Sequence, residues 1–277
     1  MKKLKDILEA SILGDIEDRI DTMDETTFKA TIREFLDKNY FSRQRLAISA
    51  KPNKDGKYIV TSSGGVNVKG WEIESLTNDM FVWGKVYGDF DCSNCNNLTS
   101  LKGGPTEVLG SFKCNWCKNL KTLEGAPRRV GNVFNCEGCA NLESLKGCPK
   151  TVAVFNCGRC KNLKSLKYSP QTVDDFMCGA CDSLKDLTGM PKRVEKYLSC
   201  YGCDNLTSLK GCAEYVGEDF CCYSCQNLKS LEHCPKYVGR DFECNACGVV
   251  FKKEEVKSLC KVGAKIITGE TTYHFEL

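Results

Sequence analysis

The stretch F-N-C-E-G-C-A-N-L-E-S-L-K-G-C-P-K-T-V, residues 134–152, decides the fold, because the same phrase recurs along most of the chain. Its general form is F-x-C-x-x-C-x-N-L-x-S-L-x-G-x-P-x-x-V, and successive copies lie 21 or 22 residues apart. A repeat of this length is typical of a solenoid, in which each repeat forms one coil and packs on its neighbours. Eight copies contain a pair of cysteines: Cys92/Cys95, Cys114/Cys117, Cys136/Cys139, Cys157/Cys160, Cys178/Cys181, Cys200/Cys203, Cys222/Cys225 and Cys244/Cys247.

Apolar residues keep the same position in every repeat. Because side chains alternate along a strand, the residue two before the first cysteine shares a face with that cysteine. Two repeats are one residue shorter, and the missing residue falls between the valine and the next phenylalanine, so the strand phase is kept. The pattern predicts a mainly β solenoid of about eight coils over residues 90–247. The residues two before the first cysteine are Phe90, Phe112, Phe134, Phe155, Phe176, Leu198, Phe220 and Phe242.

The segments on both sides of the array have a different character. Residues 1–40 carry apolar residues at helical spacing, with Thr22 and Glu25 as a capping box, and predict an α-helical N-terminal segment. Residues 41–89 alternate short apolar runs with turn residues, which predicts a β-rich N-terminal cap that ends in a degenerate first coil from Trp71 onward. Residues 248–277 combine a helical pattern with a short strand and predict a small helical C-terminal cap over the open edge of the array.

The repeat resembles the leucine-rich repeat, in particular its cysteine-containing variants. In that family's block L-x-x-L-x-L-x-x-N/C, Phe134 stands at the second leucine, Cys136 at the third and Cys139 at the Asn/Cys position. The form N-L-x-S-L-x-G-A-P-x-x-V-G, plainest around Gly125 and Val130, is similar to repeats of proteins encoded by bacteriophages and gut bacteria. The resemblance implies a solenoid scaffold, and it names no partner, because such repeats host many unrelated partners.

The paired cysteines allow two interpretations. C-x-x-C pairs at this separation match a zinc-site spacing, and two neighbouring coils could supply four thiolates, which would make ligands of all sixteen paired cysteines. However, a four-thiolate site would join coils in twos, and odd and even repeats do not differ in sequence. Cys148, Cys212 and Cys234 also replace Ala, Ser or Met of other repeats, as small apolar residues would. We favour buried structural thiols and no cofactor, and we keep a zinc-binding structural module as the alternative.

Composition argues against several classes of protein. The 277 residues carry 39 basic and 36 acidic side chains, and a net charge of +3 does not demand a nucleic-acid partner. No apolar run has the length of a membrane span, and the first twenty residues lack a signal-peptide apolar core. We therefore expect no membrane contact and a cytoplasmic location. If the protein is phage-encoded, we expect it in the host cytoplasm or in the virion. With two histidines, no P-loop and no Ser/His/Asp set, we do not expect an enzyme.

The candidate binding residues lie inside the C-x-x-C pairs, where both intervening side chains are expected to point outward. Most are small or polar, but coils two, four, six and seven hold Trp116, Arg159, Tyr201 and Tyr223 at what we take as equivalent positions. Aromatic residues and arginine are the types that anchor interfaces, so we expect these four to bind another protein. Lysine rows leave nucleic-acid binding as a further alternative, although a solvated edge explains them equally well. The rows are Lys121, Lys164, Lys185 and Lys229, and Lys102, Lys146, Lys167 and Lys210.

Overall fold

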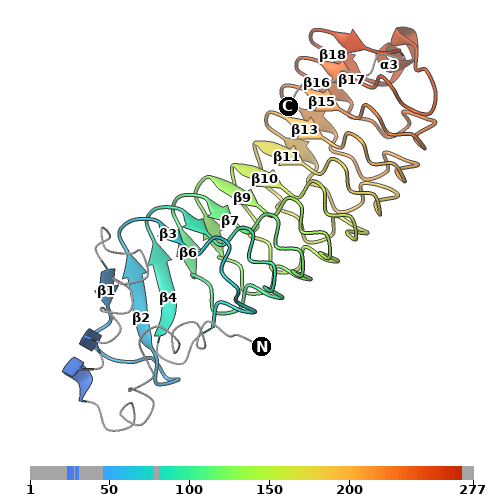
Figure 1. Ribbon diagram of the computed structural model, residues 1–277. Helices are drawn as coiled ribbons and strands as arrows, with labels where there is room; N and C mark the ends of the chain where they lie inside the picture. Colours follow the sequence, from blue (N-terminus) through green and yellow to red (C-terminus); the bar gives the residue numbers. More distant parts are fainter. Residues whose placement is uncertain (1–23, 28, 31–45, 78–80, 270–277) are drawn as a thin grey trace.

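The computed structural model describes residues 24–27, 29–30, 46–77 and 81–269. This part of the chain is an elongated stack of β coils that follow one another in sequence order (Figure 1). The predicted β solenoid is therefore confirmed. A ten-stranded sheet runs along the stack, with one short strand from each coil.

The ten strands of this main sheet are parallel and keep one register. Phe134 pairs with Phe155 and Phe155 with Phe176, so the two shortened repeats do not shift the frame, as predicted. Val66 pairs with Phe90, which places the degenerate first coil earlier than Trp71. The strands are β3 (Val66–Asn67), β5 (Phe90–Asp91), β7 (Phe112–Lys113), β9 (Val133–Asn135), β10 (Val154–Asn156), β11 (Asp175–Met177), β13 (Leu198–Ser199), β15 (Phe220–Cys221), β17 (Phe242–Glu243) and β19 (Ile266–Ile267).

The core is a column of side chains from the same positions of successive coils. Ring centroids of Phe90 and Phe112 lie 5.6 Å apart, and those of Phe112 and Phe134 lie 5.4 Å apart. The repeat phenylalanines, both repeat leucines and the first cysteine of each pair are at most 1% exposed. Full burial of one such apolar side chain contributes about 1.5–3 kcal/mol, and here most of that burial is against the neighbouring coils.

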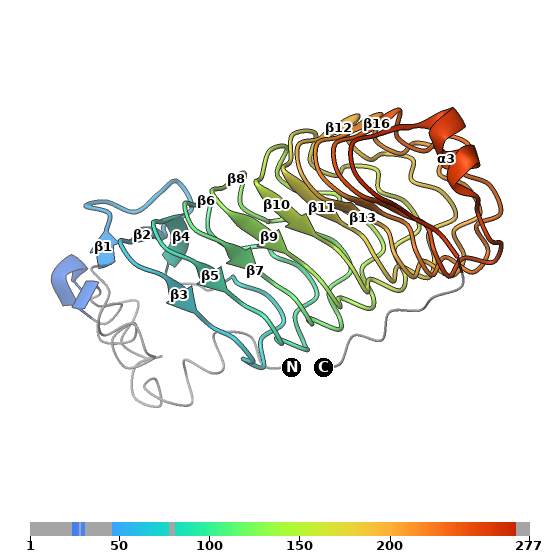
Figure 2. The ribbon, with the colours of Figure 1, turned by 90° about the horizontal axis from the view of Figure 1, so that it is seen from above.

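A second set of strands, on the valine side of the coils, is interrupted. One five-stranded sheet ends at β8, and a four-stranded sheet starts at β12 (Figure 2). Among the strands of the described residues, only β1 pairs antiparallel, with β2. The first sheet contains β1 (Leu46–Ile48), β2 (Tyr58–Ser62), β4 (Phe81–Val86), β6 (Glu107–Val108) and β8 (Arg129–Val130); the second contains β12 (Arg193–Val194), β14 (Tyr215–Val216), β16 (Tyr237–Val238) and β18 (Lys261–Val262).

The interruption coincides with the two shortened repeats, in which one residue is missing after Val152 and after Val173. A Cβ added at Gly131 or Gly217, directly after the repeat valine, would overlap a carbonyl oxygen of the preceding coil. The loss of this glycine does not by itself explain the interruption, because Leu109 occupies the same position in the uninterrupted first sheet.

The two ends of the stack were predicted to be helical. Residues 25–27 and 29–30 are helical, and the Asp24 side chain accepts hydrogen bonds from the Thr26 and Thr27 backbone N–H groups at 2.8 and 3.0 Å. The rest of the N-terminal prediction, including Thr22, lies outside the described residues. Helix α3 (Lys253–Leu259) lies at the other end of the stack and buries Val256 (Figure 1). The assignment of 248–277 as a cap stays a prediction.

Candidate functional site

The second cysteine of every repeat donates its thiol proton to a backbone carbonyl of the preceding coil. In seven repeats the acceptor is the first cysteine of that coil, and in the first repeat it is Val68. Each bond satisfies a carbonyl in the buried interior. The sulfur–oxygen distances are 3.1–3.3 Å for Cys95 to Val68, Cys117 to Cys92, Cys139 to Cys114, Cys160 to Cys136, Cys181 to Cys157, Cys203 to Cys178, Cys225 to Cys200 and Cys247 to Cys222.

Burial raises the pKa of several of the repeat thiols. Burial, followed by the neighbouring thiols, raises the pKa of the first cysteines Cys178, Cys200 and Cys222 well above the usual range, and it does the same for the second cysteine Cys203. The second cysteine of the first repeat, Cys95, differs, because its hydrogen bond with Cys117 lowers its pKa. All 21 cysteines fall within the described residues, and all are free of disulfide bonds. A thiol that donates to a carbonyl and resists ionisation is a poor nucleophile and a poor metal ligand. Within the ranges that the structure describes, no cluster of three or more His, Cys, Asp or Glu is arranged to hold a metal ion.

We therefore predict that metal removal leaves the protein folded. Reduced, purified protein is expected to contain well under one zinc ion per chain by elemental analysis, and an added chelator should leave its circular dichroism and thermal midpoint unchanged. The reason is that each second cysteine already has a carbonyl partner. A zinc content near four per chain, lost together with the fold, would contradict this prediction and establish the zinc-binding alternative.

The four residues predicted to bind a partner do not occupy equivalent positions. Trp116 and Arg159 stand directly before the second cysteine, where φ is 60° and 58°. This left-handed turn position has positive φ in all eight repeats. Tyr201 and Tyr223 stand one residue earlier, outside the left-handed region. The prediction of one common position was therefore wrong, because the turn inside each C-x-x-C pair aims its two side chains differently.

Trp116 and Arg159 line one groove that crosses several C-x-x-C turns. The Trp116 side chain is 41% exposed, and its indole covers Gly138 of the next coil so closely that a Cβ at Gly138 would overlap the ring. Arg159, one coil further, places its Nε 3.2 Å from the Glu137 carboxylate. The groove has a volume of about 400 Å³ and continues past Ala180 to Gly202. Small residues at these positions leave the groove open beside the two large side chains.

Tyr201 and Tyr223 form a separate, half-buried pair. Their rings stack with centroids 5.3 Å apart, and a Cβ at Gly179 would overlap the Tyr201 ring. Burial, with Cys221, Tyr201 and Glu243 adding to it, raises the pKa of Tyr223 to about 12. The structure thus brings Trp116 and Arg159 together and gives Tyr201 and Tyr223 a packing role beside the end of the groove.

The lysine rows lie on exposed turns, and their charge is compensated in part by the chain itself. Lys146 Nζ lies 2.7 Å from Glu124, an interaction that raises the lysine pKa and lowers the glutamate pKa. Lys167 Nζ lies 5.1 Å from the ring centroid of Tyr168. These contacts agree with the interpretation of the lysine rows as a solvent-exposed edge of the solenoid. They give no particular support to phosphate binding.

Sequence analysis missed a row of stacked charged and aromatic residues on the second valine-side sheet. The Arg193 guanidinium lies 3.6 Å from the ring centroid of Tyr215, and Tyr215 stacks on Tyr237 at 5.0 Å. Beside them, Glu214 binds both Lys192 and Lys236, at 3.2 and 2.9 Å. These residues are spaced one repeat apart in the sequence, and residues one repeat apart stack directly in a solenoid. Their spacing could therefore have predicted the row.

Comparison of the chain with protein-family models, with curated proteins and with solved structures found no significant match. Function must therefore be argued from the residues and the geometry. None of the helices in the described part of the chain is long and apolar enough to span a membrane.

Proposed function

We propose that this chain is a non-enzymatic scaffold that binds another protein through the groove of Trp116 and Arg159. The observation that carries the proposal is a large exposed aromatic side chain and an arginine, held two coils apart on rigid turns around one open groove. Tryptophan and arginine in a pocket are the residue types that supply most of the energy of protein interfaces.

The two anchors are preorganised. The Trp116 indole rests on Gly138, and Arg159 is held by Glu137 at 3.2 Å, so neither side chain has much freedom to lose on binding. The backbone beneath them is fixed by hydrogen bonds to the next coil, such as Trp116 N–H to the Glu137 carbonyl at 2.7 Å. Binding to preordered groups costs less entropy, which favours affinity for a given contact area.

The charges around the groove favour a protein rather than a polyanion. Lys118 and Lys161 are accompanied by Asp182 and Asp204 along the same groove, and Lys161 lies 4.0 Å from Asp182. An aromatic centre with a rim of both charge signs is the usual composition of a protein interface. A phosphate-binding track would instead need uncompensated basic residues along its length. Nucleic acid on the lysine rows and a zinc-binding structural module remain the alternatives.

The resemblance to repeats encoded by bacteriophages adds a proposal about location. A cytoplasmic protein, or a virion component if the chain is phage-encoded, would meet its partner in a reducing compartment. The 21 free thiols are compatible with such a compartment, since disulfides are rare there.

The groove is tested by substitution of its anchors. Trp116→Ala and Arg159→Ala are each expected to weaken partner binding by roughly 1–4 kcal/mol, with little change in thermal stability, because neither side chain belongs to the core. Tyr201→Ala is expected to cost stability as well as affinity, since its ring packs on Tyr223. Partner capture from the producing cells, followed by titration of the purified partner, provides the measurement.

Tyr87→Ala serves as the matched control, because Tyr87 is 52% exposed yet lies outside the groove. Lys164→Glu and Lys185→Glu should have smaller effects that fade with added salt. Binding that depends on these two lysines and ignores Trp116 would contradict the proposal and favour a nucleic acid or an acidic partner.

A further inference from the structure

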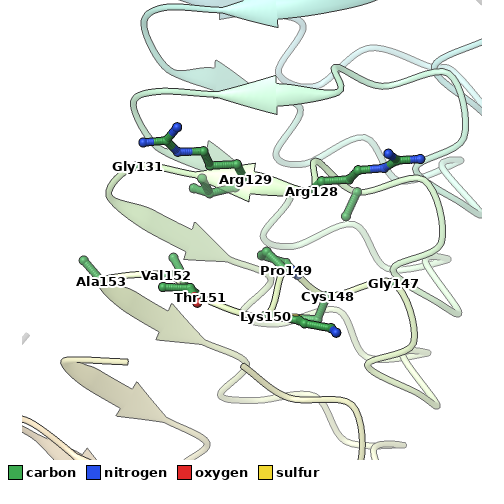
Figure 3. Close-up of a pocket in the computed structure, with 12 residues that line it drawn as sticks. Arg128, Arg129, Gly131, Gly147, Cys148, Pro149, Lys150, Thr151, Val152 and Ala153 are labelled. Atoms are coloured by element: carbon green, nitrogen blue, oxygen red, sulfur yellow. The ribbon is translucent and has the colours of Figure 1, made fainter. Parts of the chain in front are cut away.

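A second cavity lies on the valine side of the coils, where the sheet is interrupted. It has a volume of about 740 Å³ and is lined by residues 128–131 of one coil and 147–153 of the next (Figure 3). This volume is within the usual range of ligand pockets. The cavity belongs to a different part of the coil from the Trp116 groove, and the inference below does not rest on that groove.

Backbone groups are left without a ladder partner across this cavity. β8 is the last strand of its sheet, and within the described residues no backbone hydrogen bond joins residues 128–131 to residues 150–153. The coils meet again only further along, where the Val154 N–H donates to the Asn132 carbonyl at 3.1 Å. An unpaired strand edge is a template for an added extended segment.

The charge around the cavity is basic and uncompensated. Arg128, Arg129 and Lys150 line it, no acidic residue does, and none of the three forms an ion pair in the described structure. Equivalent residues in later coils are paired: Lys192 and Lys236 with Glu214, at 3.2 and 2.9 Å. The excess positive charge is therefore specific to the interrupted coils.

We propose that this cavity binds an acidic peptide segment of a partner protein in an extended conformation, paired to the β8 edge. Figure 3 shows the side chains of Arg128 and Arg129 directed to opposite ends of the upper coil segment, with Lys150 on the next coil. Because the two side chains point apart, two separate carboxylates suit them better than a single anion. Alternate residues of an extended chain are about 6.6–6.8 Å apart on one face, so two carboxylates of one peptide can pair with both guanidinium groups. The residue between them faces Val130 and Val152 on the apolar floor.

The test uses a fluorescein-labelled peptide, G-E-V-E-V-E-G, titrated with the full chain by fluorescence anisotropy. We expect saturable binding that weakens about tenfold when Arg128→Gln, Arg129→Gln and Lys150→Gln are combined, because three exposed ion pairs that each contribute modestly are lost together. The control combines Lys164→Gln, Lys185→Gln and Lys229→Gln, which removes the same charge elsewhere, and it should bind like the unmodified chain. The same peptide with N-methylated backbone amides should bind far less well.

Three results would overturn the proposal. The first is no saturable binding, or equal weakening in the control variant, which would make the attraction non-specific. The second is unchanged binding of the N-methylated peptide, which would exclude pairing with the strand edge. The third is displacement of the peptide by a ten-residue oligothymidylate whose own binding requires the three basic residues, which would make phosphate the ligand. The Trp116→Ala variant should bind the peptide normally. A negative result with the peptide would therefore leave the proposed protein-binding role of the Trp116 groove untouched.

Discussion

Cys157→Asp is expected to unfold the coils around it at neutral pH. Cys157 is fully buried among apolar side chains, and its carbonyl accepts the Cys181 thiol at 3.2 Å. An unpaired buried carboxylate must either remain charged, at a cost of several kcal/mol, or take up a proton. Protonation at pH 7 of a group with a normal pKa near 3.9 costs about 4 kcal/mol, which is a large part of the stability of a typical domain.

The pH dependence of this variant has a definite sign. Burial raises the folded-state pKa of the new carboxyl above its unfolded value. The part of the destabilisation that is due to ionisation is therefore absent below about pH 4 and grows by about 1.4 kcal/mol per pH unit above it, up to the folded-state pKa. Urea unfolding at several pH values, compared with the unmodified chain, measures this difference.

Cys157→Ala is the matched control, because it removes the thiol without adding charge. It is expected to cost about 1–2 kcal/mol, as a small truncation in a packed core does, with no added pH dependence. Equal stability of the aspartate and alanine variants at pH 7 would show that the side chain at position 157 is open to water. The first cysteines of the repeats would then not be buried core residues.

Gly239→Ala is expected to separate two coils on the valine side. A Cβ at Gly239 would overlap the Gly217 carbonyl oxygen, and the Gly239 N–H donates to the Val216 carbonyl at 2.9 Å. Overpacking costs about 1–3 kcal/mol and a lost hydrogen bond about 1 kcal/mol, so a total of about 2–4 kcal/mol is expected. Unfolding in urea measures the loss, and amide hydrogen exchange at Gly239 and Arg240 should become faster.

Gly202→Ala is the control for this change. Nothing lies within 4 Å of a Cβ at Gly202, and the equivalent position already holds Ala180 and Ala246 at φ 53°. The expected loss is therefore only that of an alanine in the left-handed region, about 1 kcal/mol, which is smaller than the loss expected for Gly239→Ala. If Gly239→Ala were as stable as Gly202→Ala, the contact between Gly239 and the Gly217 carbonyl would not limit the size of the side chain, and the expectation would be wrong.

Much of the fold could be predicted from the repeat alone. The period, the shared phase of Phe134 and Cys136, and the constant frame through the shortened repeats predicted the main sheet, because one buried face and a two-residue side-chain period leave a single register. The extra coils at Val66 and Ile266 were harder to predict, since neither carries the cysteines by which the repeat is recognised.

The candidate sites depended on side-chain positions that the repeat pattern of the sequence does not give. By itself, the sequence determined the solenoid, its buried cysteines and the residue types available for binding, because each follows from a local period repeated many times. Tertiary structure decided that Trp116 and Arg159 share a groove while Tyr201 packs on Tyr223, because neighbouring turn positions differ in φ. It also decided that Arg128, Arg129 and Lys150 line one basic cavity, because these residues come from two neighbouring coils at the place where the valine-side sheet is interrupted.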